Sequence, residues 1–152
     1  MNIKSFTFNP FQENTYVVYD KSKECIIIDP GCYNEQEQEE LRGFIDEKGL
    51  TPVKLINTHC HIDHVLGNQF VSEKWNLELY MHKLDIPLLE KAGEIGKMYG
   101  FTEFKGSPVP KHFLNDQDTL TFGSSKFDVL FTPGHAPGHI CLYSKENDLL
   151  VA

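Results

Sequence analysis

The sequence predicts an α/β fold in which helices cover one face of a mixed β-sheet. Strand-like and helix-like patterns alternate through the middle of the chain, and β-rich segments lie on both sides of this region. The chain has 152 residues, 40% of them hydrophobic and 24% charged, which is enough for one domain with its own core. No repeat and no linker rich in Pro, Gly or Ser divides it. We therefore expect a single domain over residues 1–152.

Short β segments and one well-marked helix make up the first third of the chain. The β segments cover residues 3–8, 15–19 and 24–28 and are separated by turn residues. A helix is expected over residues 35–48, because Asn34 and Glu37 form a capping-box pattern and Gly49 can close its C-terminus. The apolar stripe of this helix consists of Leu41, Phe44 and Ile45. A buried strand over residues 53–56 follows.

The rest of the chain passes from helices back to strands. Helices are expected over residues 64–75 and 84–99, with a strand over residues 77–81 between them. A loop rich in Gly and Pro over residues 100–110 comes next. The last β segments cover residues 119–122, 126–131, 140–143 and 149–151.

Charge and composition exclude several classes of partner. The net charge of −8 is poorly suited to binding a nucleic-acid backbone. No apolar run is long enough to span a bilayer, and the N-terminus lacks the apolar stretch of a signal peptide. The four cysteines form no CxxC pair, so reduced thiols are expected. We therefore expect a cytoplasmic protein with no nucleic-acid and no membrane partner.

A cluster of histidines follows the strand over residues 53–56. His59 and His61 are two residues apart in an extended segment, so their side chains can reach one point. Asp63 and His64 lie where the next helix begins and are directed toward a neighbouring point. Three imidazoles and a carboxylate suit a divalent ion, zinc above all. Solvent-exposed loop histidines are the alternative interpretation.

A second cluster follows the strand over residues 126–131. Pro133 and Pro137, each followed by glycine, exclude a regular helix and predict a tight loop. Such a loop can bring one of its histidines, His135 or His139, back over the end of the sheet to complete a three-histidine site.

These two motifs carry a resemblance to the metallo-β-lactamase superfamily. The sequence His-Cys-His-Ile-Asp-His over residues 59–64 resembles the HxHxDH signature of that family, and Thr-Pro-Gly-His over residues 132–135 resembles its next metal motif in the form typical of glyoxalase-II-like hydrolases. Ile-Asp-Pro-Gly over residues 28–31 is similar to the early turn of the family that carries an aspartate. The resemblance covers the whole chain and implies the family's αβ/βα sandwich, with metals at one edge of its paired sheets.

The resemblance also implies a role for each site residue. Three histidines would bind the first metal, namely His59, His61 and His135. Asp63 and His64 would bind the second, and Asp29 would be a carboxylate that orients the site. Cys60 would point away from the metals and pack, and His139 is expected to pack or to support the site rather than to be a ligand. His82 and His112 have no partners in the sequence, so surface or structural roles are expected for them.

One departure from the family pattern concerns the second metal. In the family an Asp shared by both metals lies just beyond a strand like residues 149–151, and another His follows later; neither position is present here. We therefore expect the domain to be incomplete at its C-terminus, the first site to be complete, and the second to lack two protein ligands. We also expect an exposed apolar face, through which the chain could form a homo-oligomer.

The resemblance implies a zinc-dependent hydrolase of glyoxalase-II type, with two zinc ions in the intact protein. Metal-activated water would attack a thioester or related carbonyl, and Asp63 would steer a proton of that water. The expected partner is a small-molecule substrate, with a glutathione thioester as the first candidate. Iron and manganese remain alternatives to zinc.

Three alternatives to this function stay open. Persulfide dioxygenases share these motifs but use one iron, held by the counterparts of His59, His135 and the shared Asp. The chain could also be a metal-binding fragment that does not turn over. A relative that processes nucleic acid is the remaining alternative, and the acidic composition disfavours it.

Overall fold

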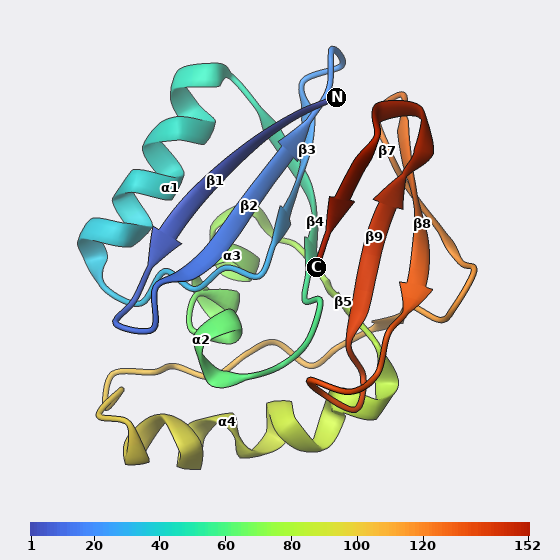
Figure 1. Ribbon diagram of the computed structural model, residues 1–152. Coiled ribbons are helices and arrows are strands. Elements are labelled where there is room, and N and C mark those ends of the chain that lie inside the picture. The colour runs from blue at the N-terminus through green and yellow to red at the C-terminus, as the bar shows by residue number, and fades with distance from the viewer.

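The computed structural model describes residues 1–152, which form two β-sheets packed face to face (Figure 1). The larger sheet has the order β1-β2-β3-β4-β5-β6 and the smaller one the order β10-β9-β8-β7. The strands of the larger sheet are β1 (Asn2–Phe8), β2 (Glu13–Tyr19), β3 (Glu24–Ile28), β4 (Thr51–Ile56), β5 (Leu79–Met81) and β6 (His112–Phe113). Those of the smaller sheet are β7 (Thr119–Phe122), β8 (Ser125–Phe131), β9 (Ile140–Ser144) and β10 (Leu149–Val151).

The first three helices pack on the face of the larger sheet that points away from the smaller sheet, and the last one lies along the bottom of the molecule in this view, against the second helix (Figure 1). They are α1 (Glu35–Lys48), α2 (Ile62–Val65), α3 (Asn68–Trp75) and α4 (Ile86–Met98). None of them is long and apolar enough to cross a membrane. Two features of the implied αβ/βα arrangement are therefore confirmed. One is the αβ half, a β-sheet covered by helices, and the other is the pairing of this sheet with a second one.

Two hydrophobic cores follow from the alternation of side chains along the central strands. Cys25 and Ile27 of β3 pack into a cluster of 20 buried residues between the larger sheet and its helices. Ile26 and Ile28 point to the opposite face and join a cluster of 12 residues between the two sheets. Because β3 is buried on both faces from Cys25 to Ile28, this part of its sequence is continuously apolar rather than alternating.

Strand direction places the chain's polar motifs at one edge. Strands β3, β4, β5 and β6 are parallel, so their C-terminal ends lie at the same edge of the larger sheet. Asp29 follows β3 and the 57–64 segment follows β4. The loop between β8 and β9 reaches this edge as well, because Ile140 N donates a hydrogen bond to Thr58 O (2.9 Å).

The observed bounds of α1 equal the predicted ones. Asn34 accepts a hydrogen bond from Glu37 N, and the Glu37 side chain accepts one from Asn34 N, so the predicted capping box is present. Gly49 ends the helix in the left-handed conformation with φ of 61°. Leu41 and Ile45 are buried against the larger sheet, as the apolar stripe predicts.

Two expectations about local structure were wrong, and one strand was missed. The predicted helix over residues 64–75 is two helices, α2 and α3, because Gly67 N donates to Pro30 O (2.7 Å) instead of continuing the first helix. The predicted helix over residues 84–99 begins later, after a 3₁₀ turn (Lys83–Asp85) that His82 caps with its Nδ1. The two-residue strand β6 was not predicted; it is too short to leave a periodic pattern.

Candidate metal centre

Three histidines from two loops meet at the edge of the larger sheet. His59 and His61 follow β4, and His135 lies in the loop between β8 and β9. Each offers one ring nitrogen to a group in which all three nitrogens lie within 4.8 Å of one another. The structure thus brings together the three residues that the two sequence motifs predicted for the first metal site.

The ring of His59 is oriented by a chain of hydrogen bonds. The Thr58 hydroxyl lies 2.5 Å from Asp29 Oδ2 and 3.1 Å from His59 Nδ1. A carboxylate can only accept, so the single hydroxyl proton points to Asp29, and the hydroxyl oxygen accepts from Nδ1–H of His59. The lone pair of His59 is therefore on Nε2, which is buried and has no hydrogen-bond partner. A buried acceptor of this kind fits a metal ligand.

The other two imidazoles face each other. His61 Nδ1 and His135 Nε2 are 3.2 Å apart, close enough that a cation between them and His59 would satisfy both nitrogens. Burial, with the neighbouring His64, lowers the pKa of His59 to about 3, and burial, with the neighbouring His135, lowers the pKa of His61. Both rings are therefore neutral near pH 7, the state in which imidazole binds metal.

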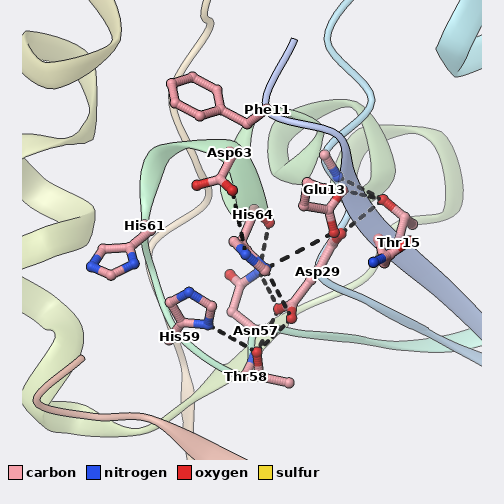
Figure 2. A network of polar contacts seen from close by, with 12 residues as sticks. Phe11, Glu13, Thr15, Asp29, Asn57, Thr58, His59, His61, Asp63 and His64 are labelled. Carbon is pink, nitrogen blue, oxygen red and sulfur yellow. Dashed lines mark hydrogen bonds and ion pairs between the residues drawn. The ribbon is translucent and has the colours of Figure 1, made fainter. Parts of the chain in front are cut away.

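Asp63 and His64 form a second pair beside His59 (Figure 2), whose ring centroid is 4.0 Å from that of His64. His64 Nδ1 lies 3.2 Å from Asp29 Oδ2, so its Nε2 is turned the other way, 3.5 Å from Asp63 Oδ2. Nε2 and the Asp63 carboxylate could hold a second ion between them. Asp29, His59 and His64 also lie within metal-binding distance of one another. The oxygens of Asp29 are, however, already engaged by Thr58 and His64.

Asp29 is the buried anchor of this arrangement. Its backbone φ of 49° lies in the left-handed region, which Asp tolerates better than most residues. Oδ1 accepts from Thr58 N at 2.7 Å, so the carboxylate fixes both the hydroxyl and the backbone before His59. Burial alone would raise the pKa of Asp29, but hydrogen bonding and the charge of His64 outweigh burial and lower it. The same contact with Asp29 outweighs burial in raising the pKa of His64.

Several supporting side chains escaped the sequence analysis. Glu13 is buried beside Asp29, and burial together with the Asp29 charge raises the pKa of Glu13 to about 10, so it is neutral at pH 7. Asn57 and Asn68 are fully buried and pair through their amides, with Asn68 Nδ2 donating to Asn57 Oδ1 (2.7 Å). Asn57 also donates to His64 O, which fixes α2 (3.2 Å). These residues belong to no short sequence motif. What distinguishes them is that they are polar and buried, which costs free energy unless their polar atoms are hydrogen-bonded.

The remaining polar residues near the motifs have structural contacts. The Cys60 side chain is buried and its Sγ lies 3.9 Å from Met81 Sδ, as expected for a packing residue. His82 stacks on Phe131, and His112 pairs with Glu78 at the surface. The ring centroid of His139 is 5.2 Å from that of His59, and its Nδ1 contacts the Thr132 hydroxyl (2.8 Å). These contacts agree with the structural roles expected for them.

Comparison with known proteins identifies the family in which this arrangement of histidines occurs. Residues 8–152 match the sequence profile of the metallo-beta-lactamase superfamily. The chain is 33% identical over 153 residues to the probable metallo-hydrolase YqgX of Bacillus subtilis, covering 100% of this chain and 70% of that protein. It is 30% identical over 141 residues to the hydroxyacylglutathione hydrolase GloC of Haemophilus influenzae, covering 92% of this chain and 65% of that protein. It resembles the crystal structure of TTHA1623 in a di-iron-bound form with a TM-score of 0.83 and 34% identity, covering 97% of this chain and 69% of that one.

Proposed function

Because this chain belongs to the metallo-β-lactamase superfamily, whose members named above include hydrolases, we propose that it is a metal-dependent thioester hydrolase. The ion would be held by His59, His61 and His135, and we propose zinc as its identity. The similarity to GloC supports hydroxyacylglutathione thioesters as the substrate class.

The unpartnered Nε2 of His59 is the observation that carries this proposal. Leaving a buried acceptor unsatisfied costs about 1–3 kcal/mol. The Asp29–Thr58–His59 chain nevertheless holds Nε2 in that state and directs it to the point that His61 and His135 also face. Three buried groups that together leave one buried lone pair without a partner are what we expect around a metal ligand.

The chemistry divides between the ion and the protein. A bound zinc would lower the pKa of a water ligand and polarise the substrate carbonyl. Asp63 would take up a proton; this role is supported by its exposure, since its side chain keeps 22% of its accessible surface while Asp29 is buried. His64 is held by Asp29 so that its Nε2 stays next to Asp63. No strong general acid is required, since a thiolate leaves without prior protonation.

The surface beside Asp63 can contact the substrate. Asn9 links Phe11 to this segment, because Asn9 Nδ2 donates to Asp63 O (3.0 Å) and Asn9 Oδ1 accepts from Phe11 N (3.0 Å). The Phe11 ring is drawn above Asp63 in the view of Figure 2, and 47% of the Phe11 surface is exposed. Phe11 packs edge-on against Tyr99, which is itself exposed, with ring centroids 5.2 Å apart. This aromatic wall would suit an apolar part of a small thioester and would exclude bulk water from one side.

A metal-supplemented assay tests the proposal. The protein is freed of metal, reloaded with zinc, iron(II) or manganese(II), and assayed for hydrolysis of S-lactoylglutathione and of a short acyl thioester, with oxygen consumption on a persulfide measured in parallel. We expect metal-dependent thioester hydrolysis that His59→Ala abolishes and His112→Ala leaves unchanged. Absence of thioester hydrolysis with every metal would contradict the proposal, and oxygen consumption with iron alone would favour a dioxygenase.

A further inference from the structure

The carboxylate of Asp85 contacts both of the loops that carry the three histidines. Its Oδ2 accepts a hydrogen bond from Cys60 N at 2.9 Å, and its Oδ1 accepts one from Gly138 N at 2.5 Å. Cys60 lies between His59 and His61, and Gly138 lies three residues after His135. Asp85 is fully buried and comes from a third part of the chain, the turn before α4.

The carboxylate replaces hydrogen bonds that neither loop can make for itself. Both loops are irregular, so the N–H groups of Cys60 and Gly138 have no partner in a helix or strand and would otherwise be buried donors. Each oxygen of Asp85 satisfies one of them. The two loops are also joined by a backbone hydrogen bond from Ile140 N to Thr58 O. Asp85 therefore provides a second connection between them, at the positions next to the histidines.

Gly138 shows how closely the loop approaches this carboxylate. A Cβ atom at position 138 would lie 2.8 Å from Asp85 Cγ and 2.8 Å from the Asp85 backbone N, closer than real Cβ atoms come. The backbone N of Asp85 cannot move freely, because it donates to His82 O (3.2 Å) within the 3₁₀ turn. Gly138 is therefore required by close contact with Asp85.

We propose that Asp85 is a positioning residue that sets the separation of His61 and His135. It does so by tying the Cys60 and Gly138 amides to one carboxylate. This inference rests on the proposed metal site but predicts something separate, namely that the site's affinity depends on a residue that touches none of the three imidazoles.

The test compares two substitutions that disturb this contact in different ways. In Asp85→Asn the carboxamide has only one acceptor oxygen, so its NH₂ group must face one of the two backbone N–H donors. Gly138→Ala keeps the charge of Asp85 but pushes the loop away. We expect each to lower zinc affinity by about 10–100-fold, the range for residues that orient ligands, and to change the visible spectrum of the cobalt(II) form. The control is Asp118→Asn, whose carboxylate caps Asn115 N away from the site.

A readout without metal separates this inference from the proposed function. In the metal-free protein, amide hydrogen exchange at Cys60 and Gly138 should be faster in Asp85→Asn than in the unmodified protein. The inference would be overturned if both variants fold and bind zinc with an affinity within twofold of that of the unmodified protein. It would also be overturned if only Asp85→Asn lost zinc affinity, because that result would indicate an effect of charge rather than of loop position. If Asp85→Asn does not fold, Gly138→Ala decides. If the unmodified protein binds no zinc, the proposed function fails, and unchanged exchange at both amides would overturn the inference independently.

Discussion

Nδ1 of His59 donates a hydrogen bond to the hydroxyl of Thr58 across 3.1 Å, and this single contact decides which nitrogen of His59 is free. The hydroxyl can accept because its own proton is held by Asp29. The aspartate of the early turn therefore acts on the histidine cluster through an intermediate residue. Asp29, which is distant from His59 in the sequence, thereby fixes the tautomer of His59.

Thr58→Val tests this relationship directly. Valine has a similar shape but no hydroxyl, so His59 loses the acceptor for Nδ1–H and its ring orientation is no longer fixed. We expect zinc affinity to fall about 10–100-fold, measured by competition with a chromophoric chelator. Thr58→Ser keeps the hydroxyl and should retain most of the affinity. Equal affinities for the valine and serine variants would show that the hydroxyl does not orient His59.

Gly67→Ala tests why the predicted helix over residues 64–75 is broken. Alanine is ordinarily favoured over glycine in a helix by about 1 kcal/mol. At position 67, however, a Cβ would lie 2.8 Å from Pro30 O, so we expect destabilisation of about 1–3 kcal/mol. The matched control is Gly43→Ala in α1, where no atom lies within 4 Å of the added Cβ, and there we expect stabilisation. Urea unfolding measures both; the same sign for both variants would contradict the explanation.

Asp20 links the two sheets and makes stability depend on pH. Its carboxylate accepts from the backbone or hydroxyl groups of Ser22, Ser124 and Ser125. Burial alone would raise the pKa of Asp20, but these hydrogen bonds outweigh burial and hold the pKa well below its usual range. The stabilisation is therefore present above the unfolded-state pKa of about 3.9 and is lost as the pH falls through the folded-state pKa.

Asp20→Asn should accordingly destabilise the protein by about 1–3 kcal/mol near neutral pH. The difference from the unmodified protein should shrink on acidification, since protonated Asp20 also loses its charge-assisted hydrogen bonds. Thermal unfolding at a series of pH values measures this, with the exposed Asp128→Asn as the control. A stability difference that stays constant down to about pH 3 would be inconsistent with this assignment.

Asn34→Ala tests the cap of α1. Alanine cannot accept from Glu37 N, so we expect the free energy of unfolding to fall by about 1 kcal/mol. Asn34→Asp retains an acceptor oxygen at the same place and should be close to neutral. If alanine and aspartate have the same effect, the side chain of Asn34 does not stabilise the helix.

The sequence was most informative where local chemistry alone sets structure. The bounds of α1 follow from Asn34, Glu37 and Gly49, all of which act within one turn of the helix ends. The break at Gly67 could not be predicted in this way, because it depends on Pro30, which is distant in sequence. The short strand β6 likewise exists only because β5 provides a parallel edge for His112 and Phe113.

The same division holds for the metal centre. His59 and His61 were predicted from a motif that follows a strand, and the choice of His135 over His139 came from the resemblance to the family; the structure brings the ring nitrogens of His59, His61 and His135 together. The buried supports, such as Glu13, Asn57 and Asp85, belong to no motif. Their positions depend on which segments meet at the edge of the sheet, and that is a property of the tertiary fold.

Zinc titration of the metal-free protein, followed by calorimetry, is the most direct test of the three-histidine site. We expect one tight site per chain that is lost or greatly weakened in His59→Ala, His61→Ala and His135→Ala and is retained in His112→Ala. A second, weaker site at Asp63 and His64 should disappear in Asp63→Ala without affecting the first, because the structure brings only these two side chains to it. Tight binding that survives the loss of His135, or no binding at all by the unmodified protein, would contradict the assignment.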